Sequence, residues 1–389
     1  MTAKPDRTSP LTAAGASRRR FVVTLAGVAA YAALRPHEAW SKKASQNPPR
    51  LQPWSLPAEP PSRPDELARA LIGAAVLAPS HWNTQPWRFE VTDNGIRLME
   101  DGRRALPASD PDQRCLRMAL GASLENMLIA ARAYGLMPRV TYAPHAGVVA
   151  EVSWTENETR RDRDLFAAIT RRRTNRRDYD GRGIFPENRA QLLALVPEGY
   201  ELHWLDDADA IHTVAEIARD AAEARIRDPK VQAEQHEWMR YDDRDARRHG
   251  DGVTTEALEL AGASRWMAAR FYDPKSWFLR FGVESSGRQV RSQIRSSGAL
   301  ALLVTRGGPS SWVGAGQVYQ RVALRATQLG ISHQPLNAPL ELEAARRDVE
   351  QRFGMRGGQP LMLLRLGHAH GPDPSVRRNV SLVSSFRTT

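Results

Sequence analysis

The sequence predicts an α+β fold made of two similar units in one chain. Two segments, 121–136 and 316–331, each begin with glycine, carry apolar residues at helical spacing, and end with glycine followed by leucine or isoleucine. Segments with the apolar or alternating pattern of strands adjoin both predicted helices. These strand-like segments are 140–143, 148–154, 299–304 and 361–366.

A shorter repeat supports the same interpretation. Segment 67–91 has the pattern of a helix, a loop and a strand, and segment 189–205 has the same order. The economical interpretation is a duplicated α+β unit. The alternative, that two amphipathic helices merely look alike, stays open at this point.

Composition limits the class of protein and its partners. The chain has 389 residues, of which 41% are hydrophobic and 25% charged, which is typical of a soluble globular protein of one or two domains. The net charge of +11 is concentrated near the start, since residues 1–44 carry eight lysines and arginines against two acids. Because no DNA- or RNA-binding motif is present, we expect no nucleic-acid partner.

The N-terminal segment has the layout of an export signal. Ser17-Arg18-Arg19-Arg20-Phe21 precedes a mildly apolar stretch that runs to Leu34. This S-R-R-x-F pattern resembles the bacterial twin-arginine signal. We therefore expect residues 1–43 to be a signal peptide read by the twin-arginine export machinery, residues 44–64 to be a linker, and the protein to be periplasmic or otherwise exported.

Metal and disulfide chemistry are not expected. Cys115 is the single cysteine, which excludes an internal disulfide and a thiolate cage, and we interpret it as a small buried hydrophobic residue. The histidines do not form a metal-ligand pattern: His368 and His370 lack further ligands at suitable spacing.

Two unusual motifs carry the functional prediction. The stretch APSHWNTQPW, residues 78–87, combines two tryptophans with many polar side chains, and the run RRRTNRR, residues 171–177, follows an amphipathic segment. A second basic cluster ends in Arg377 and Arg378. A lone basic run is usually a solvated face, but arginine forks suit phosphate, and two such runs together favour an anion site.

Taken together, these motifs resemble the FMN-dependent nitroreductase superfamily. The resemblance covers about residues 65–385, and its most specific part is Pro79–Trp87. The R-R-T-N-R form, the duplication and the segment Asp251-Gly252-Val253 are similar to the Acg-type branch, in which one chain imitates the usual homodimer. The fold implied is a three-layer nitroreductase-like fold, with a first half at 65–158 and a second half at 159–389.

The resemblance also implies a site. FMN would lie between the halves, with second-half residues at its phosphate and first-half residues at its ring. The implied phosphate-side residues are Arg172, Arg173, Thr174, Arg176 and Arg377 or Arg378. The implied ring-side residues are Pro79, Ser80, His81, Asn83 and, at the ring's edge, Gln334, Pro335 and Leu336. His81 stands where the family usually has serine.

Each half lacks the motif that the other has. One site per chain should therefore survive, so we expect a monomer that binds one FMN and acts as a pseudo-dimer. No catalytic dyad is expected, because the flavin carries the redox chemistry. Segment 228–295 is a large aromatic-rich insertion that is expected to form a lid over the flavin, the alternative being a peripheral helical pair.

Three functions fit this picture. The first is an oxidoreductase that reduces nitroaromatic, quinone or similar small acceptors through bound FMN. The second is an FMN storage protein with a covered site and little turnover. The third, a flavin-modifying or dehalogenating enzyme, has no specific support in the sequence.

Overall fold

The computed structural model describes residues 54–156, 163–241, 243–255, 257–258 and 279–386. The predicted signal peptide and the aromatic stretch 266–278 of the insertion lie outside these ranges. None of the helices in the described ranges combines the length and the hydropathy that a membrane-spanning segment requires.

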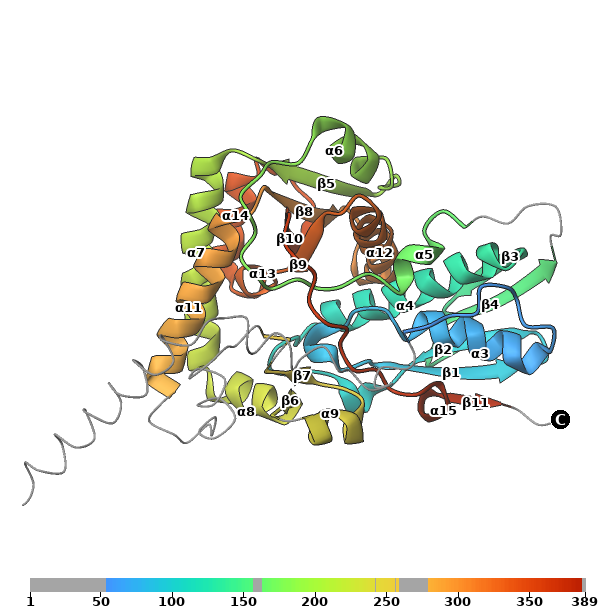
Figure 1. The fold of residues 1–389 in the computed structure, drawn as a ribbon. Helices are drawn as coiled ribbons and strands as arrows, with labels where there is room; N and C mark the ends of the chain where they lie inside the picture. Colours follow the sequence, from blue (N-terminus) through green and yellow to red (C-terminus); the bar gives the residue numbers. More distant parts are fainter. Residues whose placement is uncertain (1–53, 157–162, 242, 256, 259–278, 387–389) are drawn as a thin grey trace, which may run out of the picture.

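Two separate sheets organise the chain, which confirms the α+β prediction (Figure 1). The first sheet has the order β11-β1-β2-β4-β3 and is antiparallel except for the parallel pair β1–β11. Its strands are β1 (Trp87–Thr92), β2 (Gly95–Glu100), β3 (Leu136–Tyr142), β4 (Val148–Glu156) and β11 (Ser384–Phe386).

The second sheet is antiparallel throughout, with the order β5-β8-β10-β9. Its strands are β5 (Tyr200–Leu205), β8 (Ala299–Thr305), β9 (Ser332–Pro335) and β10 (Gln359–Gly367). A parallel pair of two-residue strands, β6 (Met239–Arg240) and β7 (Val253–Thr254), lies within the insertion. The strand segments expected at 148–154, 299–304 and 361–366 are confirmed, and the one expected at 140–143 begins earlier, directly after Gly135.

Helices cover both sheets. They are α3 (Pro64–Ala75), α4 (Arg114–Ala133), α5 (Phe166–Ile169), α6 (Pro186–Leu193), α7 (Ala208–Arg227), α8 (Pro229–Trp238), α9 (Asp243–His249), α11 (Leu279–Arg295), α12 (Trp312–Gln328), α13 (Ala338–Glu341), α14 (Glu343–Arg352) and α15 (Val380–Val383). Both helix–loop–strand repeats are confirmed, as α3 followed by β1 and as α6 followed by β5.

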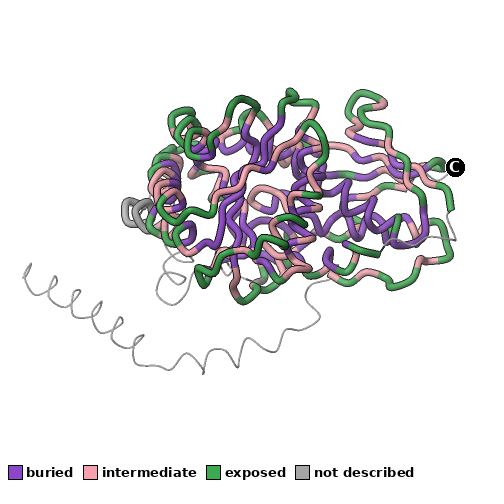
Figure 2. Tube along the Cα trace, turned by 90° about the horizontal axis from the view of Figure 1, so that it is seen from above, coloured by how far each residue is buried: buried purple, intermediate pink, exposed green. Residues whose placement is uncertain are grey.

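Strand β8 is apolar on both faces, as a strand between two helical layers must be. Ala301 and Leu303 face the core formed with α12, whereas Leu300, Leu302 and Val304 face the core formed with α7 and α14. The first sheet packs one face on α3 and α4 through residues such as Phe89 and Leu98. Figure 2 shows the buried residues running through the middle of the molecule, with exposed loops around the rim.

Helices α4 and α12, the two predicted helices, cross at their glycines. A β-carbon on Gly121 would lie 1.8 Å from the carbonyl oxygen of Val313, and one on Gly316 would lie 2.0 Å from that of Met118. Each glycine therefore meets the residue three positions before the other glycine. Such reciprocity is the pattern of a two-fold axis.

Hydrogen bonds across the crossing keep the same reciprocity. The Gln320 amide donates to Asn126 Oδ1 at 2.7 Å, and Arg321 pairs with Glu125 at 3.0 Å. The sequence placed the helix starts too late, since the glycines lie inside the helices rather than at their first turns. The helix ends are as predicted: Gly135 and Gly330 follow with φ of 79° and 69°, a conformation in which glycine avoids the strain of a β-carbon.

Candidate functional site

The loop between α3 and β1 holds three non-glycine residues in the left-handed region. These residues are Trp82 at φ 49°, Asn83 at φ 54° and Gln85 at φ 52°. A left-handed conformation is rare for a side chain as bulky as tryptophan, and it persists only where surrounding contacts enforce it. The Gln85 backbone N–H donates to Ser80 Oγ at 2.9 Å, which closes the loop on itself.

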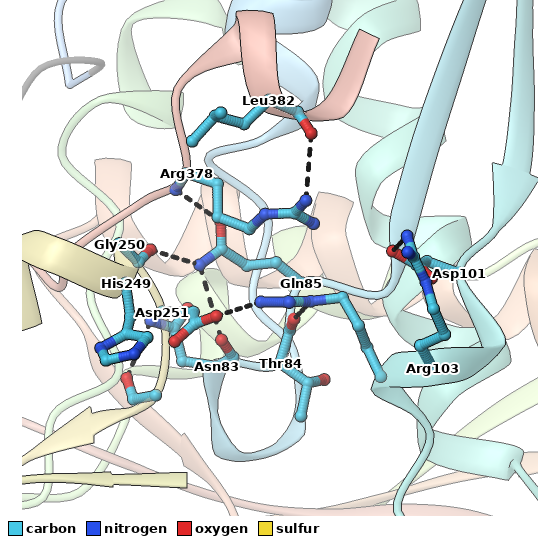
Figure 3. Close-up of polar contacts among 12 residues, drawn as sticks. Asn83, Thr84, Gln85, Asp101, Arg103, His249, Gly250, Asp251, Arg378 and Leu382 are labelled. Atoms are coloured by element: carbon cyan, nitrogen blue, oxygen red, sulfur yellow. Dashed lines mark hydrogen bonds and ion pairs between the residues drawn. The ribbon is translucent and has the colours of Figure 1, made fainter.

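Two distant segments enforce this loop conformation (Figure 3). The buried Gln85 amide donates to the Gly250 carbonyl at 2.8 Å, and its oxygen accepts the Arg378 backbone N–H at 2.9 Å. The segment Asp251-Gly252-Val253 is docked there as well. Asp251 pairs with Arg240 at 2.6 Å and also with Arg104.

Asn83 belongs to this scaffold. Its amide donates to the carbonyls of Gly252 at 2.9 Å and Val376 at 3.1 Å, and its oxygen accepts from Arg377 Nη1 at 2.9 Å. Its side-chain hydrogen-bonding groups are thus used within the protein. Asn83 does not line the neighbouring cavity, in contrast to the ring contact that the resemblance implied.

A cavity of about 250 Å³ lies beside the loop and takes walls from both halves of the chain. Six of the predicted site residues line it, namely Pro79, Ser80, His81, Thr174, Arg176 and Pro335. The α4 residues Cys115, Met118, Ala119 and Ala122 form another wall, and Tyr319 of α12 also lines it. The motif at 79–81 and the arginine run therefore meet at one space, although about ninety residues separate them in sequence.

Next to this cavity lies a cationic cluster of the buried Arg172 and Arg377 and the half-buried Arg173. Arg172 contacts Thr174, which lines the cavity, and Arg377 contacts Ala78, which precedes Pro79 of its lining. Arg172 is 2% exposed and Arg377 is 8% exposed. Burial lowers the pKa of Arg172, and burial together with Arg172 and Arg173 lowers the pKa of Arg377 well below its ordinary value. Burial and the nearby Arg172 lower the pKa of Arg173 to about 10.

The cluster has more donors than the described part of the protein satisfies. Arg172 Nη1 donates to Thr174 Oγ1 at a long 3.5 Å. Arg377 uses Nη1 on Asn83 Oδ1 and the Val376 carbonyl, both at 2.9 Å, and Nη2 on the carbonyls of Leu77 and Ala78 at 3.4 and 3.2 Å. The Nε atoms of Arg172 and Arg377 are buried and, among the described residues, have no hydrogen-bond partner. Neither guanidinium pairs with a carboxylate there. Buried charge without a partner is costly, so this arrangement fits a bound anion.

The predicted site residues Gln334, Leu336 and Arg378 are not among those that line the cavity. Gln334 is buried and accepts from Arg365 Nε at 2.6 Å, and Leu336 packs in the core against α7. Arg378 donates to the Leu382 carbonyl at 3.1 Å while its backbone holds Gln85. Arg176 reaches the cavity and donates to the Ala257 carbonyl at 3.0 Å. The motif positions therefore divide into residues that line the cavity and residues that brace it.

The structure brings together three polar side chains that the sequence did not connect. His81, Cys115 and Glu341 offer ligand atoms that all lie within 4.8 Å of one another in the cavity. Glu341 pairs with Arg225 at 2.8 Å. The sequence contained no local signal for this group, because its members come from three separate segments; Cys115 is buried as expected but also lines the cavity.

The electrostatics of this group favour neutral side chains. Burial, reinforced by Arg225, Arg114 and Arg176, lowers the pKa of His81 to about 3. Burial raises the pKa of Glu341 to about 7 against the opposing effect of Arg225, and it raises that of the Cys115 thiol well above its ordinary value. The three arginines that act on His81 also oppose a bound metal cation, whereas burial favours the protonated Glu341 carboxyl.

A second cavity, of about 980 Å³, lies on the other side of the α4–α12 crossing. It is lined by Ser310, Val313, Gly314 and Gln317. These positions correspond to Cys115, Met118, Ala119 and Ala122 of the first cavity, shifted by the interval that separates Gly121 from Gly316. The two cavities thus occupy equivalent places about the crossing.

Several polar groups of the second cavity are paired within the protein. Tyr142 Oη donates to Gln317 at 2.8 Å, Gln317 donates to Glu125 at 2.9 Å, and Arg321 pairs with the same carboxylate. Tyr200 Oη donates to the Ser311 carbonyl at 2.8 Å. Among the described residues that line it, no group of buried, unpaired arginines matches the cluster at the first cavity.

Comparison with known proteins yields distant relatives. No family model matches the chain. A protein of Mycobacterium tuberculosis H37Rv with the provisional name NAD(P)H nitroreductase Rv3131 is 27% identical over 344 residues, covering 82% of this chain and 91% of its own. The M. tuberculosis protein provisionally named NAD(P)H nitroreductase acg is 24% identical over 323 residues, covering 80% of this chain and 93% of its own.

Solved structures show weaker similarity. The FMN- and NADPH-dependent nitroreductase NfnB of a Sphingopyxis strain has a TM-score of 0.38 at 16% identity, covering 58% of this chain and all of its own. A nitroreductase from Anabaena variabilis has a TM-score of 0.39 at 10% identity, covering 79% of this chain and 88% of its own. Similarities of this size carry no argument about function. By sequence, however, the chain is similar over 82% of its length to a mycobacterial protein named as a nitroreductase, which supports its resemblance to the nitroreductase superfamily.

Proposed function

We propose that this chain is an FMN-dependent oxidoreductase of the nitroreductase type that reduces nitroaromatic, quinone or similar small acceptors. The observation that carries the proposal is the cluster of Arg172, Arg173 and Arg377, which has no carboxylate partner among the described residues and lies next to a cavity walled by both halves. An anionic phosphate monoester is the ligand that such arginines suit. The names of the mycobacterial relatives support the redox assignment.

The residues present fit FMN in two respects. The orphaned Nε donors of Arg172 and Arg377 would hold the phosphate, with Thr174 beside them. The cavity lined by Pro79, Ser80 and Pro335 would take the ring system. When bound, the flavin supplies hydride and electron transfer, and the protein supplies binding, orientation and proton management.

The polar group in the cavity suits proton delivery. Reduction of a quinone or nitro oxygen consumes protons as well as electrons. The Glu341 carboxyl, with its pKa raised to about 7 by burial, retains a proton near neutral pH, and it lies close to His81 and Cys115. Glu341 is therefore the proposed proton donor to the acceptor.

The proposal includes a single site in an internally duplicated chain. The reciprocal contacts of α4 and α12 and the equivalent placement of the two cavities support an arrangement that imitates a homodimer. Among the residues that the structure describes, the arginine cluster lies next to the first cavity and has no equivalent at the second. We therefore expect one FMN per chain in a monomer.

The insertion is proposed to cover this site. Gln235 of α8 lines the cavity, and the nearby Trp238 ring packs under the Arg104 guanidinium at 5.2 Å. The segment at 250–252 also fastens the 79–87 loop. These contacts support a lid formed in part by residues 228–258.

Export is proposed from the N-terminal sequence alone. The S-R-R-x-F motif supports recognition by the twin-arginine machinery and delivery to the periplasm. Recovery of the protein from the periplasmic fraction of its host tests this part of the proposal.

The function is tested by titrating the purified chain with FMN. We expect saturation at one FMN per chain, loss of the flavin absorbance on reduction with NADPH or dithionite, and its return when a quinone or nitroaromatic compound is added. Dithionite bleaching without any effect of either nicotinamide donor or acceptor would favour storage. Failure to bind FMN, or binding of two per chain, would overturn the proposal.

A further inference from the structure

The residues just before α3 form a strap, residues 54–63, that crosses the first half. The Tyr134 hydroxyl donates to the Pro57 carbonyl at 2.9 Å, and Arg163 pairs with Glu59 at 2.8 Å. Leu56 packs against the core beside Gly73. The strap is therefore anchored along its length, which fixes the position of its first residue, Trp54.

Trp54 lies on the cationic cluster. Its ring is 4.1 Å from the guanidinium carbon of Arg173 and 5.0 Å from that of Arg377. Its indole N–H donates to the Ser375 carbonyl at 2.8 Å, two residues before Arg377. One side chain thus connects the second-half arginine run to the C-terminal basic segment.

This geometry suits an anion site with an aromatic wall. A ring stacked on the face of a guanidinium leaves the N–H groups at its edge available to an oxyanion. The ring also excludes water from the arginines, and lower local polarity strengthens their attraction for an anion. Stacking on the indole also holds the long side chains of Arg173 and Arg377 in place. These side chains therefore lose less conformational entropy when a ligand binds.

We propose that Trp54 forms the outer wall of the phosphate site and controls how slowly a phosphate-bearing cofactor leaves it. This inference rests on the proposed FMN function. It adds a binding residue outside both basic motifs and assigns a role to the strap. Release of the ligand would require the indole to separate from Arg173 and Arg377.

The test compares ligand release from the full chain and its Trp54→Ala and Trp54→Phe variants. Each protein is loaded with FMN or with riboflavin, which lacks the phosphate, and the return of flavin fluorescence on dilution gives the rate of release. We expect Trp54→Ala to release FMN about tenfold faster, whereas Trp54→Phe retains a ring face and stays closer to wild type. Riboflavin release should be the same in all three proteins.

The control variant is Glu187→Gln, at an exposed carboxylate of α6 that belongs neither to the strap nor to the cluster. Its FMN release should match that of wild type. Equal FMN release by wild type and Trp54→Ala, or equal acceleration of FMN and riboflavin, would overturn the inference.

Inorganic phosphate separates this inference from the proposed function. If the arginines and Trp54 form an anion site, phosphate should raise the Tm of wild type more than that of Trp54→Ala, whether or not FMN binds. A wild-type chain that binds no FMN but shows this difference would refute the FMN proposal and support the phosphate site. An equal effect of phosphate on both proteins would refute the role of Trp54.

Discussion

The two cavities that flank the α4–α12 crossing differ in how their polar groups are satisfied. Next to the first, the buried Arg172 and Arg377 each have an Nε donor that the described residues leave unpaired. In the second, Gln317 and Arg321 share the carboxylate of Glu125. Equivalent positions thus line one space suited to a ligand and another in which polar side chains pair with one another.

This difference shows that symmetry of the scaffold does not imply symmetry of the sites. The backbone crossing is reciprocal at Gly121 and Gly316, whereas the side chains around it are not. A binding site depends on which donors remain unsatisfied, and a few substitutions change that without altering the packing of the helices.

The largest expected effect concerns the shared scaffold. Gly121→Ala and Gly316→Ala should each lower the free energy of unfolding by about 3 kcal/mol, because each β-carbon would collide with a backbone carbonyl of the other helix. Urea denaturation measures this. Gly330→Ala is the control: its φ of 69° costs about 1 kcal/mol, but its β-carbon meets nothing within 4 Å. A large loss of stability in one of these two variants and none in the other would show that the two helices are not equivalent at their crossing.

The next effect separates the cavities. Arg172→Gln should weaken FMN binding about 30-fold, the equivalent of losing one or two hydrogen bonds to a charged group. Arg117→Gln, which changes the lining of the second cavity, should leave the affinity unchanged. Calorimetric titration of both variants with FMN measures these affinities. Weaker FMN binding by Arg117→Gln would contradict the assignment of FMN to the first cavity.

The smallest effect concerns the proton held in the first cavity. The folded protein raises the pKa of Glu341 from 4.5 to about 7, so between these values the native state keeps a proton that the unfolded chain releases. Stability contributed by this group is therefore lost as the pH rises from 4.5 to 7. Glu341→Gln should remove most of this pH dependence of the free energy of unfolding between pH 4.5 and 7.

The exposed Glu343, two residues further along, supplies the matched control. Glu343→Gln should retain the wild-type slope across the same range, since its carboxylate lies at the surface. Identical slopes for wild type and Glu341→Gln would show that the buried carboxyl does not hold the proton.

The sequence predicted those parts of the fold that local pattern determines. The glycines after α4 and α12, the apolar strands β8 and β10, and both helix–loop–strand units follow from periodicity and turn chemistry. It did not predict that β11 would join the first sheet, because a three-residue strand has too little pattern to indicate its partner.

The sequence likewise predicted those parts of the candidate site that local residue clusters mark. Unusual residue clusters identified the loop at 79–87 and the arginine run, which the structure brings to one cavity. Periodicity could not show that Asn83 and Gln334 are used within the protein, since their partners lie far away in sequence. Glu341 and Trp54 were missed because neither belongs to a local motif, and only the fold reveals their surroundings.

The parallel pairing of β11 with β1 has a consequence for synthesis of the chain (Figure 1). Strand β1 is translated long before the basic pair Arg377–Arg378 and Ser384–Phe386 emerge from the ribosome. The 79–87 loop lacks its backbone partner until Arg378 has been made, and the first sheet stays incomplete until residues 384–386 have been made. Although domains generally fold from the N-terminus onward during translation, this half of the molecule must wait for residues translated after the second sheet.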